Sequence, residues 1–215
     1  TQNSSAGLIH TGGSGGVLGY SNSMGGFDVT VEYAPALTTA DNGDGGASGD
    51  NTSLANGSNV NFAINNSSLI DGLAFGVGAG QSEYDNEAIL GHEDGSSVVG
   101  YANYTMGSIT AGVTLSDSNN TRTATGANGG GREVEAYGVS MAINDNLSIS
   151  YNQHNMTYKK NAAANPDVEQ ESTGIALAYT MGGATLAIQN NSMDNVSGTA
   201  NSNDEITEVS LSLAF

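Results

Sequence analysis

Residues 205–215 read Glu205-Ile206-Thr207-Glu208-Val209-Ser210-Leu211-Ser212-Leu213-Ala214-Phe215. From Glu208 onward, apolar side chains occupy every odd position, and polar or small side chains occupy every even position. This strict period of two predicts a β-strand with one apolar face and one polar face. Such a strand can pack its apolar face against a second sheet or expose it to lipid. The pattern of the rest of the chain is needed to distinguish these two environments.

The same alternation recurs from residue 17 to the end of the chain. Tight turns are predicted near Met24, Ile70, Met106, Ile143 and Met181, and the connections between the resulting hairpins are long and polar. Gly-Gly, Asp-Gly and Asn-Asp-Asn sequences at these turns are expected to supply the positive φ that tight hairpins need. The repeat of one hairpin and one long loop predicts about eleven antiparallel strands. Short turns at one end and long loops at the other are typical of transmembrane β-barrels.

Composition excludes several other classes of protein. The 215 residues contain no cysteine, which rules out disulfides and thiolate metal sites. With 22 acidic and 4 basic residues the net charge is −18, so a nucleic-acid partner is not expected. No apolar run is long enough for a transmembrane helix. No nucleophile, phosphate-binding or zinc motif is present, so we expect neither an enzyme nor an obligatory cofactor.

A family resemblance rests on residues 16–31, GVLGYSNSMGGFDVTV. This segment resembles the strand and turn that follow the constriction loop in alphaproteobacterial general porins, and the order of strands, turns and loops is similar from there to Phe215. The resemblance implies a trimeric, sixteen-stranded barrel in the outer membrane of Gram-negative bacteria, through which small hydrophilic solutes and ions diffuse passively. It also implies that Phe215 belongs to the assembly signal.

The resemblance further implies two regions. Residues 1–16 would be the tail of the inward constriction loop, and residues 17–215 would form barrel strands with short periplasmic turns and long external loops. Eleven strands would leave two unpaired edges, which are costly in lipid. We therefore expect five N-terminal strands of the barrel to lie outside this sequence.

If the apolar parity faces lipid, the opposite parity faces the pore. The residues expected to line it are Asp28, Thr30, Glu32, Asn59, Asn61, Asn65, Thr110, Thr114, Glu208, Ser210 and Ser212, together with His10 from the first region. Fixed carboxylates in this set predict a preference for cations. Gly76, Gly78, Gly80 and Gly112 share the parity; either they leave room for the inward loop and widen the passage, or they only reflect a glycine-rich composition. Tyr20, Tyr33, Tyr104, Tyr151 and Tyr179 are candidates for interfacial girdles.

One loop suggests an alternative. Asp41, Asp44 and Asp50 offer oxygen ligands for Ca²⁺ on a glycine-rich segment, although the pattern neither repeats nor matches a known calcium loop. A solvated acidic loop is the favoured interpretation. The alternative function is a secreted or surface-attached β-rich adhesin or structural protein with calcium-binding loops, whose apolar faces would pack against each other in a dry core.

Overall fold

The computed structural model describes residues 17–34, 56–84, 94–119, 131–160 and 166–214. The predictions made for His10, for the loop carboxylates Asp41, Asp44 and Asp50, and for Phe215 fall outside these ranges. Among the described residues, no helix has the length and apolar character needed to cross a bilayer.

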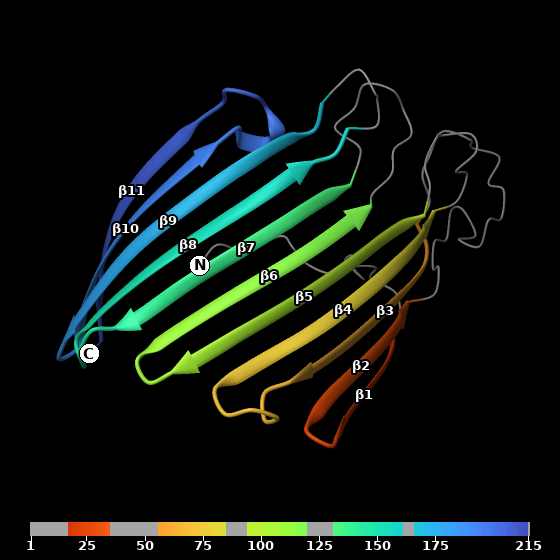
Figure 1. Cartoon of the computed structure of the whole chain (residues 1–215), viewed down its shortest axis with the longest axis horizontal. Helices are drawn as coiled ribbons and strands as arrows, with labels where there is room; N and C mark the ends of the chain where they lie inside the picture. Colours follow the sequence, from red (N-terminus) through yellow and green to blue (C-terminus); the bar gives the residue numbers. More distant parts are fainter. Residues whose placement is uncertain (1–16, 35–55, 85–93, 120–130, 161–165, 215) are drawn as a thin grey trace.

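Eleven strands form one antiparallel sheet in which each strand pairs with its neighbours in chain order, as the alternation predicted (Figure 1). The strands recede from the viewer at both edges of the sheet, so the convex face is in front in Figure 1. No pairing joins the first strand to the last among the described residues. The strands are β1 (Leu18–Met24), β2 (Phe27–Ala34), β3 (Asn56–Asn66), β4 (Leu73–Tyr84), β5 (Gly95–Met106), β6 (Ile109–Asn119), β7 (Arg132–Ala142), β8 (Leu147–Tyr158), β9 (Val168–Met181), β10 (Ala184–Asp194) and β11 (Asp204–Leu213).

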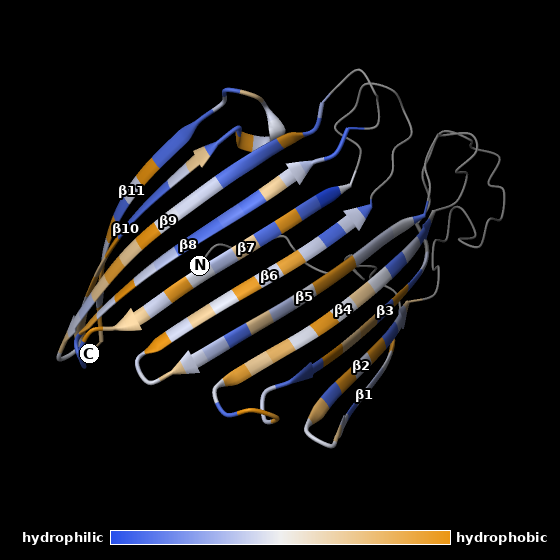
Figure 2. Ribbon diagram, viewed as in Figure 1, coloured by the Kyte–Doolittle hydropathy of each residue, from blue (hydrophilic) through white to orange (hydrophobic). Residues whose placement is uncertain are grey.

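Apolar side chains of the strands point mainly to the convex face and remain exposed there. Val77 is 53% exposed and Leu211 is 64% exposed, and both belong to the apolar parity of their strands. Among the described residues only Ala34, Val134 and Met156 are buried apolar side chains. Figure 2 shows the alternation as bands of orange and blue along each ribbon. The dry core between two apolar faces that the adhesin alternative required is therefore absent from the described part of the chain.

The tight turns lie where the sequence predicted them. Gly25, Gly26, Gly72, Gly107 and Gly182 adopt positive φ, a conformation in which a Cβ would clash with the backbone.

The prediction of positive φ was wrong for the turn between β7 and β8. No residue of Asn144-Asp145-Asn146 has positive φ. Instead the side-chain Oδ1 of Asn144 accepts hydrogen bonds from the backbone N–H groups of Asn146 and Leu147, at 2.9 and 3.0 Å. The asparagine side chain thus acts beside its own backbone carbonyl, which also accepts from the N–H of Leu147, at 3.3 Å, in closing the turn.

The connection between β10 and β11 folds back over the long-loop ends of β8 and β9. It contains the 3₁₀ turn η1 (Val196–Gly198). The N–H of Ser197 donates to Oε1 of Gln170 at 2.8 Å, and Gly198 lies against the ring of Tyr158. The register places both partners on the concave side of the sheet, so this connection bends inward at the rim.

Candidate functional site: the concave wall of the sheet

Strand register brings the polar positions predicted from the sequence onto one face. One row runs across the strands through Asp28, Asn65, Gly76, Tyr101, Thr114, Ala136, His154 and Ser172. By the same alternation Thr30, Glu32, Asn59, Asn61 and Glu208 lie on this concave face. Their common face is observed, whereas their role as pore-lining residues stays a prediction.

Glycines on the concave face lie opposite asparagines on the neighbouring strand. Gly80 pairs with Asn61, and Gly112 pairs with Asn103; a Cβ at either glycine would collide with the amide oxygen of its partner. A Cβ at Gly76 would lie 2.8 Å from the Cβ of Asn65. These glycines therefore make room for flat amide side chains across the strand pair. Neither interpretation offered by the sequence, room for an inward loop or mere composition, had identified these partners.

The densest example of this arrangement surrounds Gly174 on β9. A Cβ at this position would lie 2.6 Å from Oδ1 of Asn152 on β8 and 2.7 Å from Oδ1 of Asn191 on β10. The two amide oxygens are thus within about 5.3 Å of each other, because each lies that close to one point. Two amides from strands on either side of β9 therefore converge above a single glycine.

A hollow of about 660 Å³ lies against this part of the concave wall. Its volume falls in the range of about 300–1,000 Å³ that is usual for small-molecule sites. Its lining includes Asn103, Asn152, Asn191 and Gln189, with Glu208 as the one carboxylate and no lysine or arginine. The side-chain N–H of Gln189 donates to the carboxylate of Glu208. The hollow is consequently rich in amides and nearly neutral.

A buried patch on the same wall was not anticipated. Val134 and Met156 occupy concave positions and are buried, and next to them lie His154, 93% buried, and Ser172, 99% buried. The Nε2 atom of His154 has no hydrogen-bond partner among the described residues. A signal existed in the sequence, because Val134 stands between Glu133 and Glu135 and so reverses the phase set by the rest of its strand.

The convex face has a sharp boundary between apolar and polar residues. Following each strand toward the long loops, the next convex residues after the boundary are Asp117, Glu135, Gln153, Thr173, Asn190 and Thr207 on β6 to β11. The last apolar residues before the boundary are Leu115, Tyr137, Tyr151, Ile175, Ile188 and Val209 on the same strands.

The boundary shifts along the register from strand to strand. Tyr137 pairs with Val113 rather than with Leu115, so the boundary moves by two residues between β6 and β7. It moves by two again at β7–β8 and at β9–β10 and stays in place at β8–β9 and β10–β11, which makes six residues over five steps. A rise of about 3.3 Å per residue and a strand spacing of about 4.8 Å convert this shift into an angle. For the boundary to lie level, in a single plane, the strands must be tilted by about 40° from the normal to that plane.

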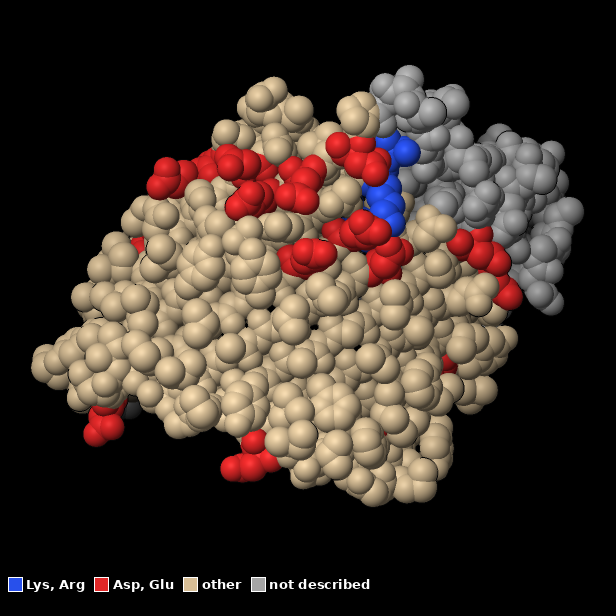
Figure 3. Space-filling model, viewed as in Figure 1, with Lys and Arg blue, Asp and Glu red and all other residues tan. Residues whose placement is uncertain are grey.

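Charged residues on the convex face of the strands lie on the long-loop side of this boundary. Figure 3 shows acidic residues gathered toward the long loops and a broad zone without charge below them. Glu169, Glu171 and Glu205 are convex carboxylates near the long-loop ends of their strands, while Asp71 and Asp145 lie in the tight turns at the opposite end. An uncharged belt thus separates two polar rims.

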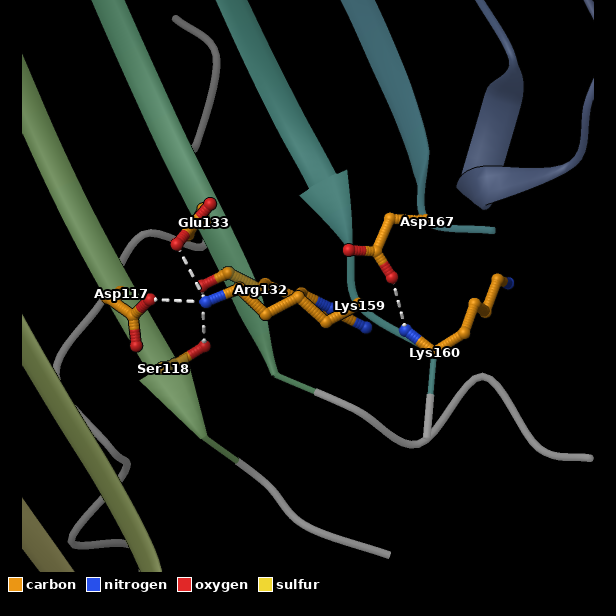
Figure 4. A network of polar contacts seen from close by, with 7 residues as sticks. All are labelled: Asp117, Ser118, Arg132, Glu133, Lys159, Lys160 and Asp167. Carbon is orange, nitrogen blue, oxygen red and sulfur yellow. Dashed lines mark hydrogen bonds and ion pairs between the residues drawn. The ribbon is translucent and has the colours of Figure 1, made fainter. Parts of the chain in front are cut away.

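Three of the four basic residues are described, and all lie at the long-loop ends of β7 and β8 or just beyond them. The Nζ atom of Lys159 contacts Oδ2 of Asp117 at 2.8 Å and Oε1 of Glu133 at 2.7 Å (Figure 4). Asp117 and Glu133 are paired across β6 and β7, so their carboxylates would repel each other without the lysine. The guanidinium of Arg132 lies 5.2 Å from the ring centre of Tyr158.

The Lys159 contacts predict a measurable dependence on pH. Hydrogen bonds from its ammonium to Asp117, and then to Glu133, raise the pKa of Lys159 above its ordinary value. Stabilisation by the charged lysine is therefore fully present below the unfolded-state pKa of about 10.4 and is lost as pH rises through the higher folded-state pKa. We expect Lys159→Met to lower the free energy of unfolding at pH 7 by at most about 1 kcal/mol, because the lysine and both carboxylates are partly exposed to solvent.

Denaturant titrations of wild type and Lys159→Met at pH 7 and above pH 11, each in low and in 1 M salt, measure this effect. The difference between the two proteins should shrink at high pH and at high salt. Adding Glu133→Gln to Lys159→Met should recover part of the loss, because it removes the repulsion of Asp117. A loss that is the same in every condition would assign Lys159 a packing role instead.

Comparisons with known proteins bear on the fold. No family model and no curated protein sequence matches the chain. Among solved structures, the anion-selective porin from Comamonas acidovorans is 15% identical with a TM-score of 0.65, and the match covers 93% of this chain and 59% of the porin. A porin refined at 1.8 Å resolution is 14% identical with a TM-score of 0.62, covering 93% and 61%.

A third similar structure is the trimer form of OmpT, an outer membrane protein of Vibrio cholerae. It is 12% identical with a TM-score of 0.57, and the match covers 92% of this chain and 64% of OmpT. The chain thus spans about three fifths of the length of these barrels. Its eleven antiparallel strands, joined in chain order, have the fold of the bacterial outer-membrane porins, which are transmembrane β-barrels.

Proposed function

We propose that this chain forms a large part of an outer-membrane porin that lets small hydrophilic solutes and ions diffuse passively. The observation that carries the proposal is the level boundary on the convex face. Its shift of six residues over the five steps from β6 to β11 fits the tilt of about 35–45° typical of transmembrane barrels. A belt of exposed apolar side chains below that boundary is costly in water and favourable in lipid.

The tyrosines on the convex face support a membrane location. Tyr33, Tyr137 and Tyr151 lie at the boundary toward the long loops, and Tyr104 and Tyr179 lie close to the tight turns. All five are at least 37% exposed. Tyrosine favours the two interfaces of a membrane, where its ring contacts the acyl chains and its hydroxyl contacts water. Two such levels are what a spanning barrel needs.

Oligomeric state and lineage belong to the proposal as well. The outer-membrane protein OmpT has a trimer form, and the resemblance to alphaproteobacterial general porins implies the same assembly. We therefore propose a homotrimer in the outer membrane of a Gram-negative bacterium, with lipid around the convex belt. Diffusion through such a pore needs no catalytic group. Calcium binding by the loop carrying Asp41, Asp44 and Asp50 also stays a proposal, supported by the carboxylate oxygens that these residues offer as ligands.

The concave charges favour cations. Asp28, Glu32, Asp204 and Glu208 lie on this face, and Arg132 is the basic residue there among the described residues. Fixed carboxylates along a pore raise the local concentration of cations and repel anions. The similar Comamonas porin is anion-selective, so ion preference within this fold depends on such side chains rather than on the barrel.

Ion selectivity tests both parts of the proposal. Reconstituted into planar bilayers under a KCl gradient, the protein should give stable conductance steps with a reversal potential that favours K⁺. Glu32→Gln combined with Glu208→Gln should bring the permeability ratio closer to one. Glu169→Gln combined with Glu171→Gln, on the convex face, removes the same charge outside the pore and should have a much smaller effect.

The possible outcomes separate the claims. Steps with anion preference would overturn the cation proposal and leave the channel intact. Equal effects of the concave and convex pairs would mean that selectivity arises elsewhere. A protein that stays monodisperse in water without detergent and gives no steps would sink the channel proposal itself.

A further inference from the structure

The amides around Gly174 have capacity for hydrogen bonds that the described residues do not use. The side chains of Asn152 and Asn191 make no hydrogen bond to another described residue, although their amide oxygens converge to within about 5.3 Å. Both line the hollow on the concave wall and are partly exposed. An amide carries two N–H donors and a carbonyl acceptor, so this pair presents both kinds of group to whatever occupies the hollow.

Further polar groups border the pair on both sides. Toward the tight turns, Gln189 lies two residues from Asn191 on β10 and donates to the carboxylate of Glu208 on β11. Toward the long loops, His154 lies two residues from Asn152 on β8, and its Nε2 lacks a partner among the described residues. The amides thus lie between an acceptor carboxylate and an imidazole whose Nε2 has no partner among the described residues, on strands β8, β10 and β11 of one sheet.

The chemistry of these groups selects one class of solute. Anions would find no lysine or arginine in the lining of the hollow, and a cation would find one carboxylate that already accepts from Gln189. Hydroxyl groups both donate and accept, which matches paired amides, and neighbouring hydroxyls of a sugar ring can engage both amides at once. The hollow of about 660 Å³ is large enough for a small-molecule site.

We propose that Asn152 and Asn191, held above Gly174 and supported by Gln189 and Glu208, form a subsite in the pore wall for neutral polyhydroxylated solutes such as sugars. The subsite rests on the proposed channel function and specifies a solute class for it. Binding is weak, because one wall supplies the contacts and the solute has to leave again. Its effect is to raise the residence time of sugars in the pore over that of other neutral solutes.

Substitution of Gly174 provides the most specific test of the subsite. Gly174→Ala adds one methyl group within 2.6 Å of the Asn152 amide and 2.7 Å of the Asn191 amide, so both must move. It changes no charge and removes no functional group. Gly100→Ala is the matched control, because its Cβ would have ordinary contacts, at 3.7 Å from Val77 and 3.9 Å from Gly76. It also lies on the convex face of the same sheet.

The experiment measures single-channel conductance in KCl while maltose or sucrose is added, and fits the sugar concentration that half-blocks the current. Polyethylene glycol of similar size serves as a probe without hydroxyls along its length. We expect sugar to block the wild type and Gly100→Ala alike, and block in Gly174→Ala to need about tenfold more sugar, as the loss of two modest hydrogen bonds predicts. Conductance of Gly100→Ala in KCl alone should remain near the wild-type value.

A second variant guards against a folding defect. Asn152→Ala combined with Asn191→Ala removes both amides and leaves the glycine, and it should weaken sugar block at least as much. Sugar block that is no stronger than polyethylene glycol block, in a protein that conducts, would overturn the subsite and leave the channel standing. Equal sugar block in all variants would do the same. Absence of conductance in the wild type would instead overturn the proposed function.

Discussion

Replacing Leu177 by arginine is expected to destabilise the barrel in a lipid bilayer by about 2–4 kcal/mol, the cost measured for basic residues in the middle of the lipid-facing belt of such proteins. Leu177 lies on the convex face of β9 between Ile149 of β8 and Ile188 of β10, and it is 38% exposed. Since neighbours on both sides are aliphatic, the guanidinium would find neither water nor a partner at that level.

The adjacent residue provides the control. Ala178 lies on the concave face between Ser148 and Ala187, where an arginine would reach the pore rather than lipid. Ala178→Arg should change the free energy of unfolding by much less than Leu177→Arg and should shift ion selectivity toward anions. Denaturant titration in lipid vesicles measures the first quantity, and reversal potentials measure the second. A larger loss at Ala178 than at Leu177 would mean that the two faces have been assigned the wrong way round.

The second large effect is expected at Gly72, in the turn between β3 and β4. This glycine has φ of +77°, and a Cβ there would collide with the carbonyl oxygen of Thr105 on the neighbouring strand. Its own carbonyl accepts a hydrogen bond from the N–H of Thr105 at 2.8 Å, which ties the turn to β5. Gly72→Ala should therefore cost about 1–3 kcal/mol for the backbone conformation and about 1 kcal/mol more for the displaced hydrogen bond.

Two other glycines separate these contributions. Gly107 has φ of +60° with nothing within 4 Å of an added Cβ, so Gly107→Ala should show the backbone cost alone. Gly19 has neither positive φ nor a close neighbour, so Gly19→Ala should be neutral or slightly stabilising. The expected order of stability loss is Gly72, then Gly107, then Gly19, measured by denaturant titration. A loss at Gly107 equal to that at Gly72 would remove the steric part of the argument.

The sequence was enough to predict those features of the fold that depend on local pattern. Period-two alternation placed the strands, and short sequences that contain glycine placed most of the tight turns, because both signals lie within a few neighbouring residues. The assignment of residues such as Glu32 and Glu208 to one common face followed from the same alternation. The turn at Asn144 was mispredicted in its chemistry, since a side-chain carbonyl and a positive φ can both close a turn after an asparagine.

The candidate site was less accessible, because it depends on register between strands. Gly174 stands over 15 positions from both Asn152 and Asn191 in the sequence, and the register decides that all three meet. A shift by one residue would send the amides to the opposite face. Burial of Val134 and His154 on the polar parity was missed for another reason: the alternation changes its phase where the strands leave the apolar belt, and a single phase was assumed for each strand.

The tilt of the strands has a consequence for the amides themselves. Asn103, Asn152 and Asn191 share one hydrogen-bonded row, which runs at right angles to strands inclined by about 40°. Each step from one strand to the next therefore raises the row by about 3 Å along the barrel axis, and the five steps from β5 to β10 raise it by about 15 Å. The row therefore follows a helical path around the barrel axis and does not form a closed ring. A solute that moved from one amide to the next would rotate about this axis as it advanced.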